Sequence, residues 1–411
     1  MSMLVETSED ESPTILIVAK FIGELHQGAA KRTELAETPA RRLVAECEAL
    51  LERGQHVALL ARLLEQSHVL FTKASSSDAE TCLLLMANLV PRLPEKEALE
   101  AAHQLCIAVS TDAGPGDQSA PLRLRVLLAL FNLMPFNYGR YTVLMRLLQY
   151  GTHASLSDSL LAVTKRVDVW VKEWELGMGD VRALYLALAN AFRSQQGSRE
   201  HFSFLIKYLS TFEGTGESIP VAEIRAEAMR AAVEFMASPD VFQCDLLDLG
   251  SVQQLQSDPQ AGPVFALLGT MLTGKLGDFV AFTKANPGLL ERLELSQEGV
   301  LTKVRLLSLA ALGSESNSGE ISYAQVKQTL QVEETEVEEW IVKAIGLKLL
   351  EAKMDQLRQV VVFNRCTQRV FGDAQWQELR SKLGAWKSNL GNVCKMVHNT
   401  RITMAAQADR S

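Results

Sequence analysis

One segment of the sequence has most of a phosphate-binding loop. Residues Gly269 to Lys275 (GTMLTGK) match the glycine-rich loop and the lysine of a Walker A motif, which hold nucleotide phosphates. The next residue is Leu276, which cannot ligate Mg²⁺ as serine or threonine does, and no apolar strand precedes the loop. Because Val264 to Leu276 has a helical pattern instead, we expect Lys275 on a helix surface and no bound nucleotide.

Residues for metal or nucleophilic chemistry are equally sparse. Among the seven histidines, His103 alone shares a helix face with a cysteine, Cys106, at a ligand-like spacing. Two donors do not complete a tetrahedral zinc site. The sequence has no His-x-His pair, no zincin helix and no Gly-x-Ser-x-Gly elbow. We therefore expect no enzyme activity, no metal and no cofactor, and a core or surface position for His103 and Cys106.

The composition describes a helical protein of a reducing compartment. The 411 residues are 47% hydrophobic but only 6% aromatic, and abundant Leu and Ala favour packed helices. A net charge of −8 gives no overall attraction to nucleic acid. Six widely spaced cysteines and an acidic N-terminal segment (ETSEDE) predict a protein of the cytoplasm or the nucleus and not a secreted one. The uncharged stretch Pro259 to Gly274 is too short to cross a membrane.

From residue 14 to about Leu312 the apolar residues repeat with a helical period. Val181, Leu184, Leu188 and Phe192, for example, fall on one face. Short clusters of Gly, Pro or Ser separate the helical segments, and none of the segments has the pattern of a strand. The expected fold class is mainly α: a right-handed α-solenoid of helical pairs, followed by a winged-helix module and a long C-terminal helix.

The pattern changes after Gly313 to Glu320 (GSESNSGE), which predicts a linker. Ser322 to Gln325 has the form of a capping box that opens a short helix, and a second helix follows it. Leu349 to Asp355 and Gln359 to Asn364 then read as two strands joined by a tight turn. Helix, turn, helix and β-hairpin is the order of a winged helix.

A winged helix raises the question of nucleic-acid binding. The helix that would enter the major groove opens with five acidic residues between positions 333 and 339, which phosphates would repel. Residues 340–411, by contrast, hold twelve Lys or Arg against five Asp or Glu. The candidates for an RNA-facing or ribosome-facing surface are Lys353, Arg358, Arg380, Lys382, Lys387 and Lys395. The alternative is that these charges form a solvated helix face.

The last helix, from Asp373 as N-cap to about His398, carries an apolar seam. The seam residues are Trp376, Leu379, Leu383, Trp386, Leu390, Val393 and Val397. They are spaced alternately by three and four positions, a period of 3.5 that is typical of a coiled coil. We interpret the seam as a surface that receives helices of other chains. The alternative is that its first turns pack on the hairpin and the rest frays.

The order of these elements resembles the PCI family of scaffold subunits, which occurs in the proteasome lid, the signalosome and eukaryotic translation initiation factor three. The amino-acid sequence itself is most similar to that of one subunit of the initiation factor. This resemblance extends from about residue 122 to 397, with little resemblance before Pro121. The segments that carry the resemblance are Arg140 to Val143, Val171 to Leu176, Phe242 to Leu247, Thr302 to Leu309, Leu330 to Asp355, Gln359 to Phe363, Arg369 to Gly372 and Gln375 to Gln377.

The resemblance implies a scaffold subunit of the initiation factor. It would join other PCI and MPN subunits through the winged helix and the C-terminal helix, and meet the small ribosomal subunit and mRNA through the complex, without DNA or membrane. Two alternatives stay open. A PCI subunit of the signalosome or the proteasome lid would use the same elements. An independent RNA-binding winged-helix protein would bind RNA with a steep salt dependence.

The expected domain limits follow from these patterns. Residues 1–13 form a disordered N-terminus and residues 14–200 the N-terminal helical repeats. Residues 201–371 form the PCI domain, with a helical part (201–312), a linker (313–320) and the winged helix (321–371). Residues 372–400 are the C-terminal bundle helix, and residues 401–411 a disordered tail.

Overall fold

The computed structural model describes residues 14–27, 39–111, 117–193, 199–213, 221–315, 319–369 and 372–408. The chain divides into two compact units, Met1–Thr211 and Phe212–Ser411. We expected a boundary near residue 200, one helix earlier. Helix α12 (Arg199–Ser210) stays with the first unit because it packs on α11 (Met178–Ala191). The predicted disorder of residues 1–13 falls outside the described residues.

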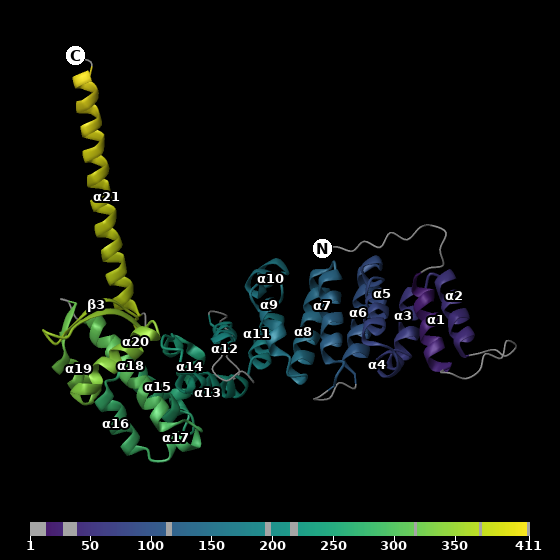
Figure 1. Cartoon of the computed structure of the whole chain (residues 1–411), viewed down its shortest axis with the longest axis horizontal. Coiled ribbons are helices and arrows are strands. Elements are labelled where there is room, and N and C mark those ends of the chain that lie inside the picture. The colour runs from purple at the N-terminus through teal and green to yellow at the C-terminus, as the bar shows by residue number, and fades with distance from the viewer. Residues whose placement is uncertain are drawn as a thin grey trace. The chain divides into compact units, whose positions relative to one another are not determined.

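The described part of the first unit consists of α-helices and one short 3-10 helix (Figure 1). Its elements before α11 are α1 (Thr14–Gln27), α2 (Pro39–Glu52), α3 (His56–Glu65), α4 (His68–Lys73), α5 (Ser76–Ala87), η1 (Val90–Arg92), α6 (Glu95–Ser110), α7 (Ala120–Leu133), α8 (Asn137–His153), α9 (Ser157–Thr164) and α10 (Val167–Glu173). The structure has no strand among the described residues of 14–312, as predicted.

Neighbouring helices of this unit pack on one another and bury apolar side chains between them. Helix α7 packs on α5, α6 and α8, and α8 packs in turn on α11. Leucines fill the interior: Leu59, Leu60 and Leu63 of α3 are completely buried. Trp170 and Trp174 stack with ring centroids 5.4 Å apart. Each helix buries one stripe against its neighbours, which is the packing expected of a helical repeat.

The second unit begins with helices and ends with a small sheet and one long helix. Its elements are α13 (Val221–Ala237), η2 (Leu246–Asp248), α14 (Gly250–Gln253), η3 (Gln254–Ser257), α15 (Gly262–Thr273), α16 (Leu276–Ala285), α17 (Leu289–Arg292), α18 (Gln297–Glu315), β1 (Glu320–Ser322), α19 (Tyr323–Leu330), η4 (Glu334–Glu336), α20 (Val337–Gly346), β2 (Leu350–Asp355), β3 (Val360–Cys366) and α21 (Asp373–Ala408).

The sheet of this unit has three antiparallel strands in the order β1-β3-β2. The predicted hairpin is confirmed as β2 and β3, with Lys353 opposite Val362. Strand β1 was not predicted, because its three residues are too few to show a period. The predicted capping box is confirmed at the start of α19: Gln325 N donates to Ser322 Oγ at 3.4 Å, and Ser322 N donates to Gln325 Oε1 at 3.3 Å.

The predicted linker is wrong at its beginning, because α18 continues to Glu315, and at its end, because β1 begins at Glu320. Gly313 is buried, and a Cβ atom there would overlap Cys366 Sγ and lie 2.9 Å from the Phe363 ring. Helix α18 and the winged helix share one hydrophobic core. The run of Gly and Ser therefore ends a packed helix as well as joining two elements.

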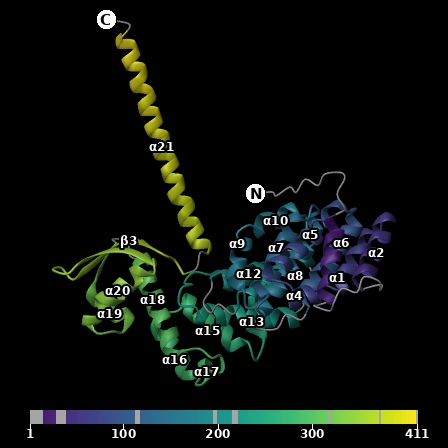
Figure 2. The ribbon, with the colours of Figure 1, turned by 45° about the vertical axis from the view of Figure 1, so that its right-hand side comes forward.

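Helix α21 has 36 residues and, in Figures 1 and 2, is one uninterrupted helix. It extends ten residues beyond the expected end at His398, so the prediction of a disordered tail is wrong for residues 401–408. Asp373 is its first helical residue and not its N-cap. Instead, Gly372 N donates to the Gln375 side chain at 3.1 Å, and Trp376 N donates to the Gly372 carbonyl. Residues 409–411 lie outside the described residues.

Candidate partner-binding helix

The apolar seam of α21 is exposed along its whole length. All seven predicted seam residues, from Trp376 to Val397, are exposed, and Trp386 and Leu390 each keep 65% of their accessible surface. Met396, which the spacing analysis did not include, is exposed beside Val397. Large apolar side chains gathered on one face of a helix usually mark a binding surface. The described residues of the second unit leave this face open to solvent.

Arg369 lies four positions before the first residue of α21 and binds carbonyls of two distant helical segments. The sequence patterns did not predict this role. Arg369 Nε donates to the Leu307 carbonyl at 2.7 Å, in α18, and its Nη1 donates to the Gly274 carbonyl at 2.8 Å. Gly274 directly follows α15, so the guanidinium satisfies a carbonyl at the C-terminus of that helix. These carbonyls lie some sixty and ninety-five positions away in the sequence, and no local pattern points to them.

Helix α18 carries two further cations, whose side chains donate hydrogen bonds to carbonyls at the C-terminal ends of other helices. Lys303 is buried; its Nζ donates to the Phe235 carbonyl and, at 2.8 Å, to the Ser238 carbonyl at the end of α13. Arg305 Nε donates to the Leu330 carbonyl at 3.1 Å, at the end of α19. One turn of α18 thus joins the helical part of the second unit to its winged helix. Both residues lie in the segment Thr302 to Leu309 that carries the family resemblance.

The predicted basic surface is spread over three elements. Lys353 lies on β2, and Arg358 lies in the turn between β2 and β3, where it pairs with Glu320 at 3.3 Å. The other four, Arg380, Lys382, Lys387 and Lys395, are exposed on α21. The structure therefore brings only these last four together on one element.

The acidic N-terminal end of α20 faces solvent. A nucleic acid that received this helix in its major groove would therefore meet these carboxylates. Glu333, Glu336 and Glu339 are exposed, and Lys327 approaches Glu333 only to 3.9 Å. Glu338 is half-buried and accepts hydrogen bonds from Tyr323 Oη at 3.2 Å and from Gln356 at 3.0 Å. The carboxylates at this helix end would repel a phosphate backbone.

The glycine-rich loop joins two helices and follows no strand. Helix α15 ends at Thr273 and α16 begins at Leu276, so the expected continuous helix is interrupted at Gly274 and Lys275. Lys275 is exposed, and its backbone N–H donates to Asp278 at 2.9 Å. The backbone amides are thus arranged as a helix cap and not as the phosphate cradle between a strand and a helix that the Walker motif needs.

His103 and Cys106 do not cooperate as metal ligands. His103 is exposed on α6, with Nε2 at 3.2 Å from the Arg146 guanidinium. Cys106 is buried, and this burial raises the pKa of its thiol to about 12. Within the described part of the chain, no three His, Cys, Asp or Glu side chains come together as a metal site.

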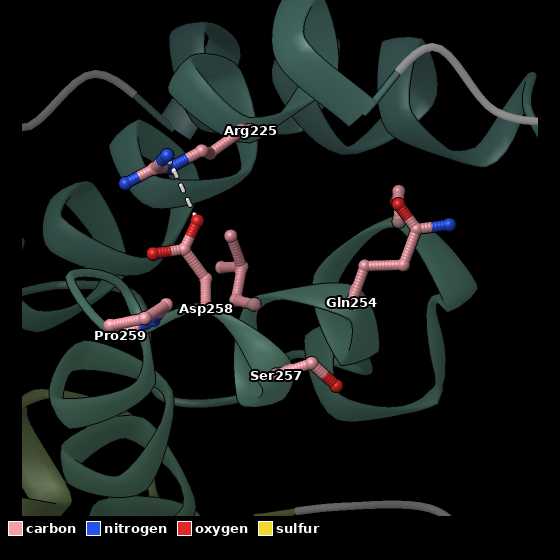
Figure 3. A pocket seen from close by; sticks show the side chains of 7 residues that line it. Arg225, Gln254, Ser257, Asp258 and Pro259 are labelled. Atoms are coloured by element: carbon pink, nitrogen blue, oxygen red, sulfur yellow. Dashed lines mark ion pairs between the residues drawn. The ribbon is translucent and has the colours of Figure 1, made fainter.

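A surface hollow of about 220 Å³ lies beside η3 (Figure 3). The Arg225 guanidinium points to the Asp258 carboxylate, with Nη1 and Oδ2 2.9 Å apart, and Arg225 Nη2 also donates to Gln260 at 3.0 Å. Ser251, Gln254 and Ser257 complete the polar lining. The charges of the hollow thus neutralise each other, and its residues hold η3 against α13.

None of the helices in the described ranges has both the length and the apolar character needed to cross a bilayer.

Comparison with known proteins finds matches for both the winged-helix region and the C-terminal helix. Residues 284–365 match the PCI domain, and residues 369–395 match the family model described as the C-terminal helix of eIF3 subunit M. The chain is similar to proteins named eukaryotic translation initiation factor 3 subunit M. That of Dictyostelium discoideum is 30% identical over 88% of this chain and 89% of the relative. That of Nematostella vectensis is 31% identical over 81% and 86%, and that of Schizosaccharomyces pombe 26% identical over 92% and 91%.

These alignments are longer than the segment from 122 to 397, so the similarity also includes residues before Pro121. The match to the C-terminal helix begins at Arg369, before α21 itself, and contains six of the seven seam residues, from Trp376 to Val393. The chain belongs to the family of eukaryotic translation initiation factor 3 subunit M.

Proposed function

We propose that the protein is a non-catalytic scaffold subunit of translation initiation factor 3 in the cytoplasm. The observation that carries the proposal is the exposed seam of α21, in a helix that matches the C-terminal helix of the family. Exposed tryptophans and leucines at heptad spacing are costly in water and gain stability when a partner helix covers them. The family assignment favours the initiation factor over the signalosome or the proteasome lid.

The winged helix supplies a second surface for other PCI and MPN subunits in this proposal. Leu357, at the tip of the β2–β3 turn, is 99% exposed, and Val342 is exposed on α20. Two isolated apolar side chains beside a three-stranded sheet suit contact with a neighbouring subunit better than contact with phosphates. Recruitment of the small ribosomal subunit and mRNA then belongs to the assembled complex.

The test is a pair of substitutions in the seam, Trp386→Asp together with Leu390→Asp. Trp386 lies about 15 Å along the helix from Trp376, and both changed side chains are exposed in the chain alone. We expect the tagged full-length variant to lose co-purification with the other initiation factor 3 subunits, because each charge would face apolar neighbours at a cost of several kcal/mol. Its thermal melt alone should remain as in the wild type.

The matched control is Ser381→Asp together with Ser388→Asp, which places the same charges on the opposite side of α21, also exposed. This control should assemble normally. Normal assembly of the Trp386 and Leu390 variant would contradict the proposal. Unfolding of that variant in isolation would show that α21 is an internal strut and not a binding helix.

A further inference from the structure

The charges beside the seam define the partner more closely than the seam itself does. With Trp376, Leu383, Leu390 and Val397 at heptad position a and Leu379, Trp386 and Val393 at position d, the flanking positions e and g can be assigned. They are Gln375, Arg380, Lys382, Lys387, Asn389, Cys394 and Met396. Three of these seven are basic and none is acidic. Lys395 falls at position f, opposite the seam.

Residues at e and g lie next to the partner helix and determine which helices pair, through interhelical ion pairs. Arg380, Lys382 and Lys387 are exposed in this chain, as are the seam residues between them. The apolar seam and the three cations therefore form one continuous surface. A partner that covers the seam must also come close to the cations.

A second copy of this chain is a poor occupant of that surface. In a parallel pair, Lys382 would oppose Lys387 of the other copy, since position g of one heptad faces position e of the next. In an antiparallel pair, e faces e and g faces g, and the basic residues would again lie together. Like charges at these positions weaken pairing. The charge pattern thus favours a different chain.

We propose that the helix that packs on the α21 seam carries acidic residues at its own flanking heptad positions, and that Arg380, Lys382 and Lys387 select it. This inference rests on the proposed function, because it assumes that the seam receives partner helices. It also separates these three residues from Lys395, which lies on the far side of α21 and takes no part in the selection.

The test uses two synthetic helical peptides of three heptads, both with leucine at positions a and d. One has Glu at all e and g positions and the other has Lys. Binding of each labelled peptide to the full-length protein is measured by fluorescence anisotropy. We expect the Glu-flanked peptide to bind at least about tenfold more tightly, because three attractive pairs replace three repulsive ones. The ratio should shrink as salt rises.

Charge reversal provides the matched comparison. The variant Arg380→Glu, Lys382→Glu and Lys387→Glu should prefer the Lys-flanked peptide, whereas Lys395→Glu should keep the wild-type preference. Equal binding of the two peptides, binding of neither, or an unchanged preference in the triple variant would overturn the inference. So would tight binding of a single-stranded RNA that is lost in the triple variant, because the cations would then face phosphates.

These outcomes are distinct from failure of the proposed function. If the Trp386 and Leu390 variant loses the initiation factor subunits while the peptides are bound equally, the seam binds partners but the flanking charges do not select them.

Discussion

At the scale of single residues, the cations with the most definite role are buried or half-buried and donate hydrogen bonds to carbonyls at helix ends. Lys303 and Arg369 bind carbonyls at the ends of α13 and α15. In the first unit, Arg123 does the same for α6: its Nη1 donates to the Val109 and Thr111 carbonyls at 2.8 and 2.7 Å. Carbonyls at a helix C-terminus have no intrahelical partner and favour a positive charge. These side chains hold elements together and are not available to a ligand.

Lys303 should make stability depend on pH. Burial lowers its pKa from 10.5 to about 7. The unfolded chain then holds the proton more tightly than the folded one, so the charged lysine costs stability below about pH 7, and this cost is relieved as the pH rises toward 10.5. The free energy of unfolding of the wild type should therefore rise by about 2 kcal/mol, relative to Lys303→Met, between pH 7 and 9.

Urea unfolding of both proteins at several pH values measures this difference. Lys284→Met, at an exposed position on α16, serves as the control and should show no such change with pH. The prediction is wrong if the difference in free energy of unfolding between wild type and Lys303→Met stays constant from pH 7 to 9. That result would mean that the two carbonyls keep the pKa of Lys303 near its ordinary value.

At the scale of elements, α18 is the helix on which the second unit is organised. It contributes Leu306, Leu307 and Leu309 to the core of the winged helix, and Gly313 lets its last turn approach β3. The close approach is possible because glycine has no Cβ, and it brings the helix backbone against Phe363. The winged helix is therefore an extension of the helical core and not a separate module on a tether.

Substitution of Gly313 tests this packing. Gly313→Ala should lower the free energy of unfolding by about 1–3 kcal/mol, because the new methyl group would overlap Cys366 and Phe363 in a filled core. Gly346→Ala, at the end of α20, is the matched control, since a Cβ there meets no atom within 4 Å. Thermal or urea unfolding of both variants gives the comparison. Equal stability of Gly313→Ala and the wild type would show that α18 and β3 are less tightly packed than described.

At the scale of the whole molecule, charge argues against an independent RNA-binding protein. The chain carries a net charge of −8, and its candidate basic residues lie on β2, on a turn and on α21. Strong binding to nucleic acid needs several cations placed along one phosphate backbone. Among the six candidates only the four on α21 share an element, and three of these four border the apolar seam.

We therefore expect the purified full-length protein to show no measurable binding to single-stranded RNA at physiological salt. The measurement is a salt titration of fluorescence anisotropy with a labelled RNA. Binding that weakens steeply as the salt concentration rises would favour the RNA-binding alternative, because it would reveal released counterions. The measurement concerns the isolated chain and does not test the proposed recruitment of the small ribosomal subunit by the assembled complex.

The sequence by itself determined the features that follow from the spacing of residues along the chain. The helical repeat, the hairpin of β2 and β3, the capping box at Ser322 and the seam of α21 each follow from spacing along the chain, since side-chain direction repeats with the helix or strand. The spacing of 3.5 residues by itself also identifies the seven seam residues. Their binding role stays a prediction, and the experiments above test it.

Only the tertiary structure decided the features that join distant parts of the chain. Strand β1 exists because Ile321 pairs with Val361, and the end of α18 stays helical because Gly313 packs on Phe363. Arg369 likewise acts on the carbonyls of Leu307 and Gly274. In each case the stabilising partner lies tens of residues away, and a local sequence pattern records only what neighbouring residues impose on one another.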